Sequence, residues 1–210
     1  MTMSKSHLLL IGGAILACTA CKPQNAAVDN VANATVDANT ADANAASANG
    51  DATAAPTDPV ASAMAAAPAS IAGGAMIIQA AADGSMKTLR EGSNGWTCMP
   101  DNPATPGHDP MCLDANAMKW AQAWMTHKDP PANNVGLMYM LAGGSDASNM
   151  DPWGTKPAEG QKWVETGPHV MVVGSEALNA LYPSSPSPDT TKPYVMFGGT
   201  PYAHVMVPIK

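Results

Sequence analysis

The sequence Val-Gly-Leu-Met-Tyr-Met-Leu at residues 135–141 decides the fold of this chain. It is an unbroken apolar run, and Gly143-Gly144 follows it closely. A short continuous apolar run that ends in turn-forming residues is typical of a strand buried within a sheet. We therefore predict a central strand here, with further strands on either side of it.

Three shorter strands are predicted before this run and four after it. Upstream, Asp83-Gly84 separates two runs of strand character, and an Asp-Gly pair in that position favours a hairpin turn. A second turn at residues 92–95 precedes a short third strand. The predicted strands cover residues 75–80, 85–90, 96–98, 163–165, 169–174, 194–197 and 204–208.

One long helix is predicted over residues 115–128. Asp114 is a good N-cap, and Asp129-Pro130-Pro131 stops the helix. A shorter helix over residues 175–181 is capped by Ser175. The apolar face of the long helix, with helical spacing, consists of Ala117, Trp120, Ala121 and Trp124. The predicted fold class is α+β: a mainly antiparallel sheet with one principal helix packed on a face.

The first 21 residues have the pattern of an export signal. A polar head is followed by an apolar core at residues 8–17, which is shorter than the roughly 20 residues that a membrane-spanning helix needs. The segment Ile-Leu-Ala-Cys ending at Cys18 resembles the lipobox of bacterial lipoproteins, and Cys21 is an alternative attachment residue. An ordinary cleaved signal with incidental cysteines is the other interpretation.

The lipoprotein resemblance implies a cellular location. In that family the cysteine is acylated and becomes the mature N-terminus, so the chain is expected to be exported and anchored in the cell envelope. Neither Cys18 nor Cys21 is followed by Asp, which by resemblance favours the outer membrane or the periplasmic side.

Residues 22–70 are predicted to form a disordered, mildly acidic linker. Ala, Asn, Asp and Thr dominate it, and no large apolar side chain recurs with a helix or strand period. Residues 71–210 have the length of a single domain. The formal net charge of the chain is −7, and no basic stripe is present, so nucleic acid is not expected as a partner.

Cys98 and Cys112 are the two cysteines of the predicted domain. An isolated pair in an exported protein is most simply a disulfide, which here closes an aperiodic loop. The alternative is a metal site that combines both cysteines with His108.

The tetrapeptide His-Val-Met-Val occurs twice, beginning at His169 and at His204. With a strand period of two, each histidine shares a face with a methionine, Met171 or Met206. If the two strands are neighbours, these four side chains converge, and imidazole with thioether suits copper in an exported protein. The alternative is coincidence in two strands whose histidines and methionines serve the core.

Three other groups of residues are candidates for chemistry. Oxygen ligands gather at Asp146, Ser148, Asn149 and Asp151, where calcium is the functional interpretation and a hydrogen-bonded turn the structural one. A hydrolase assembled from Ser145, Asp146 and His169 lacks a supporting motif, since the nucleophile-elbow pattern fails at Ala147. Trp96, Trp153 and Trp163 lie beside turns, where aromatic side chains bind sugar or peptide or close the edge of a core.

Residues 91–101 and 109–112 resemble segments of exported bacterial proteins without an assigned activity, so this resemblance supplies no site residue. The function expected from the sequence is a non-enzymatic binding module of the cell envelope, with the membrane and a protein or small molecule as partners. The alternatives are copper binding, as the one cofactor considered, and an unrecognised hydrolase. The sequence does not decide whether the protein is an enzyme.

Overall fold

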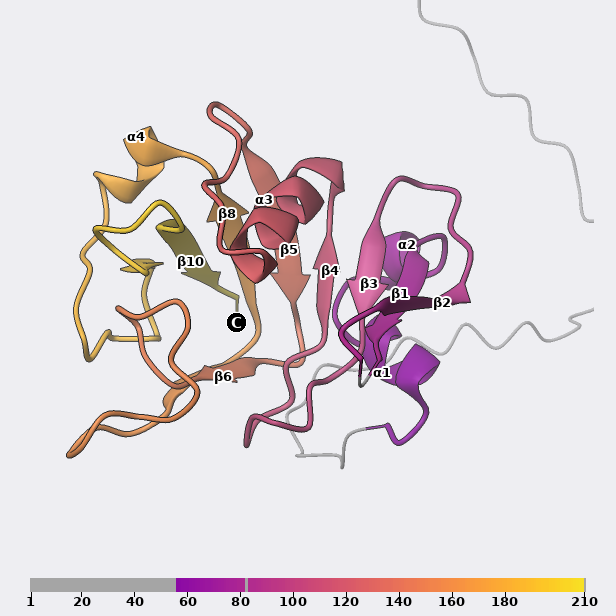
Figure 1. The fold of residues 1–210 in the computed structure, drawn as a ribbon, viewed down its shortest axis with the longest axis horizontal. Coiled ribbons are helices and arrows are strands. Elements are labelled where there is room, and N and C mark those ends of the chain that lie inside the picture. The colour runs from indigo at the N-terminus through magenta and orange to yellow at the C-terminus, as the bar shows by residue number, and fades with distance from the viewer. Residues whose placement is uncertain (1–55, 82, 210) are drawn as a thin grey trace, which may run out of the picture. The chain divides into compact units, whose positions relative to one another are not determined.

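The computed structural model describes residues 56–81 and 83–209. The run at 135–141 forms β5 (Gly136–Met140) in the interior of an eight-stranded sheet with the order β2-β1-β3-β4-β5-β8-β10-β9 (Figure 1). The other strands of this sheet are β1 (Met76–Ala80), β2 (Met86–Arg90), β3 (Thr97–Met99), β4 (Met111–Leu113), β8 (His169–Val173), β9 (Tyr194–Met196) and β10 (His204–Pro208). β6 (Gly144–Asp146) and β7 (Val164–Thr166) form a separate two-stranded sheet.

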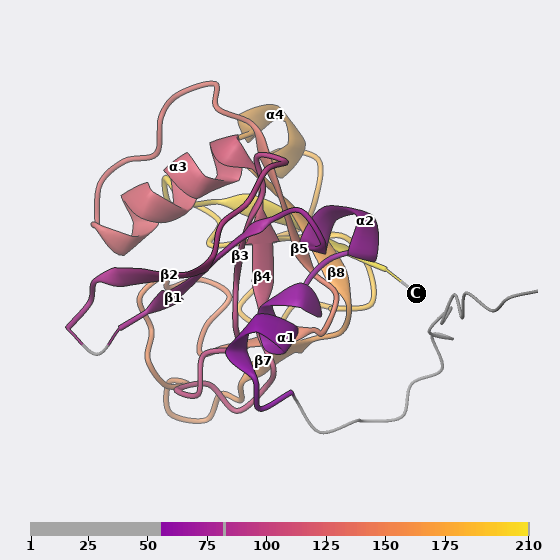
Figure 2. The ribbon, with the colours of Figure 1, turned by 90° about the vertical axis from the view of Figure 1, so that its right-hand side faces the viewer.

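The pairing within the large sheet is mainly antiparallel. β1 and β3 run parallel, and every other neighbouring pair in this sheet is antiparallel. The predicted hairpin at Asp83-Gly84 joins β1 to β2 at one edge of the sheet (Figure 2). Its loop is longer than a two-residue turn, and Gly84 alone of that pair adopts positive φ, at 81°.

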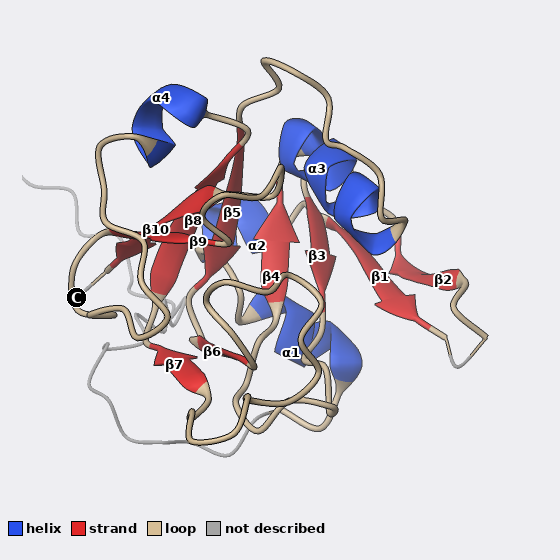
Figure 3. Cartoon of the chain, turned by 60° about the vertical axis from the view of Figure 1, so that its left-hand side comes forward, coloured by secondary structure: helices blue, strands red, loops and turns tan. Residues whose placement is uncertain are grey.

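Helices cover both faces of the sheet (Figure 3). The principal helix, α3 (Ala115–Met125), packs over the face that carries Leu113, Met138 and Met171, which we call the α3 face. Two short helices, α1 (Pro59–Met64) and α2 (Ala69–Ala72), pack on the opposite face, which carries the disulfide. A fourth helix, α4 (Glu176–Asn179), is capped by Ser175 as predicted. The predicted α+β class with one principal helix is confirmed.

Asp114 joins α3 to the central strand. Its Oδ1 accepts the amide protons of Asn116 and Ala117, and its Oδ2 accepts that of Leu137. The helix can approach this closely because Gly136 has no Cβ. A Cβ at this position would lie 2.3 Å from the backbone nitrogen of Ala117. The glycine inside the apolar run therefore permits the contact between helix and strand.

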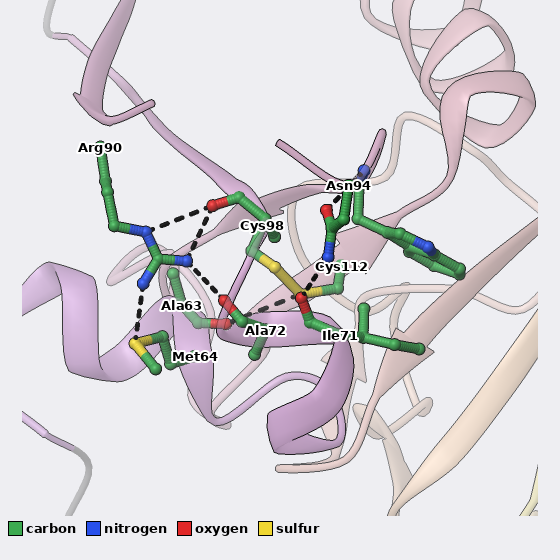
Figure 4. The surroundings of a disulfide bond; sticks show 10 residues. Ala63, Met64, Ile71, Ala72, Arg90, Asn94, Cys98 and Cys112 are labelled. Carbon is green, nitrogen blue, oxygen red and sulfur yellow. Dashed lines mark hydrogen bonds between the residues drawn. A yellow bond between two sulfur atoms is a disulfide. The ribbon is translucent and has the colours of Figure 1, made fainter. Parts of the chain in front are cut away.

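The folded part of the chain begins before residue 71, the boundary that the sequence predicts. α1 and the start of α2 lie upstream of it, and Ala63, Ala66 and Ala72 are fully buried. The Arg90 guanidinium donates to the carbonyl oxygens of Ala72 and Ala75, which ties α2 to the sheet (Figure 4). Alanine-rich helices lack the large apolar side chains by which a helical period is recognised, so this segment reads as linker in the sequence.

The disulfide prediction is confirmed. Cys98 and Cys112 are directly opposite on β3 and β4, both are fully buried, and their sulfur atoms are bonded (Figure 4). The metal-site alternative fails because both sulfurs are used in this bond. His108 instead lies 3.4 Å from the Asp101 carboxylate.

Two strands that the sequence does not predict, and the end of α3, are the larger differences from the prediction. β4 and β6 lie in segments that the sequence predicts as loops, because strands of three residues are too short to show a period. α3 ends at Met125, three residues early, and His127 adopts a φ of 55°, which a continuing helix does not allow.

The predicted signal, both candidate acylation residues and most of the predicted linker lie outside the described residues. In the part of the chain that the structure describes, no helix has the length and apolar character needed to cross a membrane.

Candidate functional site

Methionine and histidine side chains gather on the α3 face of four neighbouring strands, β5, β8, β10 and the edge strand β9. Register places Met140 opposite His169, and Met196 opposite His204. Between these pairs, Met171 lies opposite Met138 on one side and Met206 on the other. We call these seven buried side chains the His–Met face: Met138, Met140, His169, Met171, Met196, His204 and Met206.

His169 is held in one orientation at the start of β8. Its Nδ1 donates to the carbonyl oxygen of Gly167 over 2.8 Å, because a carbonyl can only accept. Its Nε2 is buried and has no partner among the described residues. A Cβ built on Gly144 would lie 3.0 Å from Met140 Cε and 3.7 Å from His169 Cε1, so this glycine leaves room beside the imidazole.

His204 repeats this arrangement at the start of β10. Its Nδ1 donates to the carbonyl oxygen of Tyr202 over 2.9 Å, and its buried Nε2 has no partner among the described residues. The rings of Trp120 and Phe197 meet the imidazole edge-to-face, with centroids 5.2 Å and 5.4 Å away. The environment of His204 is therefore aromatic on two sides.

Burial keeps both imidazoles neutral. It lowers the pKa of His204 to about 4, against the hydrogen bond to Tyr202, which favours the charged form, and the charge of His169 lowers this pKa further. Burial also lowers the pKa of His169. A neutral imidazole whose Nδ1 donates to a carbonyl has its Nε2 lone pair free, which is the form in which histidine ligates metals.

The four metal ligands predicted from the sequence lie on neighbouring strands and on one face. Met171 and Met206 are directly opposite each other, while the antiparallel register places His169 and His204 at opposite ends of the strand pair. Four residues separate His204 from the partner of His169, a rise of roughly 13 Å along the strand. The structure therefore separates the two histidines, and the strand register places Met140 beside His169 and Met196 beside His204.

The predicted hydrolase residues are not assembled. The Ser145 hydroxyl accepts the amide proton of Gly107. Strand alternation places Ser145 on one side of β6 and Gly144 on the other, and the Gly144 side faces His169. Asp146 is only partly exposed, and protein surrounds most of its carboxylate. Burial and, secondarily, the carboxylate of Asp109 raise the pKa of Asp146 to about 7.

Ser148 and Asn149, two of the four predicted calcium ligands, make hydrogen bonds to backbone groups of the protein. Ser148 Oγ accepts the amide protons of Met150 and Asp151, and the Asn149 amide group donates to the carbonyl oxygens of Ser185 and Val195. Among the residues that the structure describes, no group of three or more His, Cys, Asp or Glu side chains is placed to hold a metal ion.

The three tryptophans have different environments. Trp96 packs against Tyr139 at the edge of the core on the disulfide face, as its structural interpretation predicts. Trp153 is 43% exposed and stacks on His127, with ring centroids 4.6 Å apart. Trp163 lines a surface groove.

No family model, no curated protein and no solved structure matches the chain.

Proposed function

We propose that this chain is an exported, lipid-anchored protein of the cell envelope whose domain is a non-enzymatic binding module for Cu(I). The signal pattern, with Cys18 or alternatively Cys21 as the acylated residue, supports export and lipid anchoring in the cell envelope. The disulfide between Cys98 and Cys112 supports export, since such bonds persist in oxidising compartments. The membrane is the partner that the lipid anchor implies.

The observation that carries the metal proposal is the pair of buried Nε2 atoms without a partner. Leaving a polar atom unsatisfied in a core costs about 1–3 kcal/mol, so two such atoms on one face need a reason. Both belong to imidazoles fixed by Nδ1 on a backbone carbonyl, and each lies beside a methionine on the adjacent strand. A metal ion on Nε2 removes the cost.

The donor types favour Cu(I) over other ions. Thioether sulfur is a soft ligand that selects Cu(I), while Mg²⁺ and Ca²⁺ need oxygen ligands. The His–Met face contains five methionines and no carboxylate. Because the two histidines lie at opposite ends of the face, we expect two ions, one on His169 with Met140 and one on His204 with Met196.

A Cu(I) titration of the full chain tests this proposal, with a chromophoric Cu(I) chelator as competitor and with Cys18→Ser and Cys21→Ser in every sample, because free thiols bind Cu(I) themselves. We expect two retained equivalents in the natural chain, one in each of His169→Ala and His204→Ala, and none in the double variant. His108→Ala is the matched control, because this exposed histidine lies outside the His–Met face.

A second set of variants separates ligand loss from unfolding. Met140→Leu and Met196→Leu nearly conserve volume and remove only the sulfur, so the fold is expected to survive. Each should weaken binding of one equivalent while circular dichroism and the disulfide stay unchanged. Retention of copper by the folded double-histidine variant, or no retention by the natural chain, would overturn the proposal.

A further inference from the structure

A surface groove of about 390 Å³ lies between two segments that are distant in the sequence. One wall is β7 with the turn before it, and the other is the proline- and serine-rich loop after α4. Its size is within the range of pockets that hold small ligands. None of the residues that line the groove belongs to the His–Met face, so its role is independent of copper.

Strand alternation sets the chemistry of the first wall. Val164 and Thr166 point into the protein and are buried, so Trp163 and Glu165 face outward on the same side. Two residues along a strand place the Cα atoms of Trp163 and Glu165 about 6.6 Å apart. The side chains of Gln161, Trp163 and Glu165 make no hydrogen bond or ion pair with other described residues, so they are free to meet a ligand.

The second wall is fixed before any ligand arrives. The Asn149 amide group donates to the carbonyl oxygen of Ser185 at the root of the loop, and the Val195 amide donates to that of Pro183. Pro186 and Pro188 restrict the backbone between the two anchored residues, Ser185 and Val195. A wall already ordered loses little entropy on binding, which favours affinity for a small ligand.

We propose that this groove binds a neutral oligosaccharide, with Trp163 as the stacking platform. A sugar ring presents C–H groups on its faces and hydroxyls at its edge, so it needs an apolar plane beside hydrogen-bonding groups. The indole supplies the plane, and Glu165, Gln161 and the Ser187 and Thr190 hydroxyls supply the polar groups. The opposite charges of Lys162 and Glu165 balance, which favours an uncharged ligand.

A proline-rich peptide is the competing ligand, and the groove suits it less well. Grooves that recognise such peptides are lined by several aromatic side chains. Here Trp163 is the single aromatic lining residue, and prolines belong to the protein's own wall. The expected envelope location also brings the domain close to glycans.

Calorimetric titration of the full chain with chitotriose and cellotriose tests the proposal, with decaproline as the competing probe. We expect saturable binding of at least one trisaccharide and a loss of affinity of about tenfold or more in Trp163→Ala. Trp153→Phe is the matched control, because it changes an exposed tryptophan outside the groove, and it should bind as the natural chain does.

Three results would overturn the saccharide proposal: no saturable heat with either trisaccharide, unchanged affinity in a folded Trp163→Ala variant, or binding of decaproline in their place. The double variant His169→Ala/His204→Ala should bind the saccharide normally. The groove and the copper proposal can therefore fail separately.

Discussion

At the scale of single residues, the core of this domain contains polar atoms that ordinary packing does not explain. Tyr194 Oη and Trp120 Nε1 are buried without a partner among the described residues, as are both histidine Nε2 atoms. All four belong to side chains at the core on the α3 face. A core built for stability alone would use apolar side chains of similar volume at these positions, because an unsatisfied donor or acceptor costs free energy there.

Asp146 is the residue whose titration should be visible in the stability of the protein. Its pKa is raised from 3.8 to about 7 in the folded chain, by burial first and by Asp109 second. The folded state therefore binds more protons than the unfolded state between these values. This contribution to the free energy of unfolding is present below about pH 4 and is lost as the pH rises through 7.

Asp146→Asn should remove this dependence. We expect the variant to gain stability relative to the natural chain between pH 4 and pH 8, and the gain should level off above pH 8. Urea denaturation at several pH values measures the difference between the two chains, in which the titrations of Asp101 and the buried histidines largely cancel. Asp151→Asn, in a solvent-exposed turn, is the control. A constant difference across this range would contradict the expectation.

At the scale of elements, the junction of α3 with β5 concentrates several interactions on Asp114. Asp114→Ala removes the acceptor for two helix amides and for the Leu137 amide. Loss of an N-cap costs about 0.5–2 kcal/mol, and the unpaired strand amide adds to this, so we expect a loss of about 2–3 kcal/mol.

Asp114→Asn tests the reason for that loss. Its amide oxygen still accepts from the helix, so this variant should recover most of the helix contribution. Urea denaturation gives the free energy of unfolding for both variants. Equal losses in the two would show that the carboxylate's charge matters more than the cap.

The elements that the sequence predicts correctly are those with a strong local signal. β5, β8 and β10 are five-residue strands made mostly of apolar residues, and α3 has both a cap and an apolar face. β4 and β6 are too short for a period, and their positions depend on pairing with β3 and β7. Local signals do not encode such pairing.

The candidate site shows the same limit. The repeated tetrapeptide indicates His169, Met171, His204 and Met206, and strand alternation predicts which side chains share a face. The antiparallel register decides that the histidines lie apart and that Met140 and Met196 are their neighbours. Register depends on contacts between distant segments, which a single sequence does not provide.

At the scale of the whole molecule, the alanine-rich segment before residue 71 completes the fold. α1 and α2 cover the disulfide face, where Ile77, Cys98 and Cys112 are fully buried beneath them. The short side chains of alanine let these helices lie close to the sheet. The alanine-rich composition, which resembles that of a linker, thus allows this segment to pack into one of the two cores.

Two truncations test where the domain begins. A chain of residues 56–210 should unfold cooperatively, with a free energy of unfolding close to that of the full chain. A chain of residues 71–210 lacks α1 and the start of α2, so Ala63 and Ala66 no longer cover the disulfide face. We expect it to lose about 3 kcal/mol or more from the lost burial, and to bind a hydrophobic dye on the uncovered face.

Equal stability of the two chains would place the domain boundary at residue 71 and would show that α1 adds no stability to the domain. Arg90→Ala supplies an intermediate case, because it keeps both helices and removes only the guanidinium that ties α2 to the sheet.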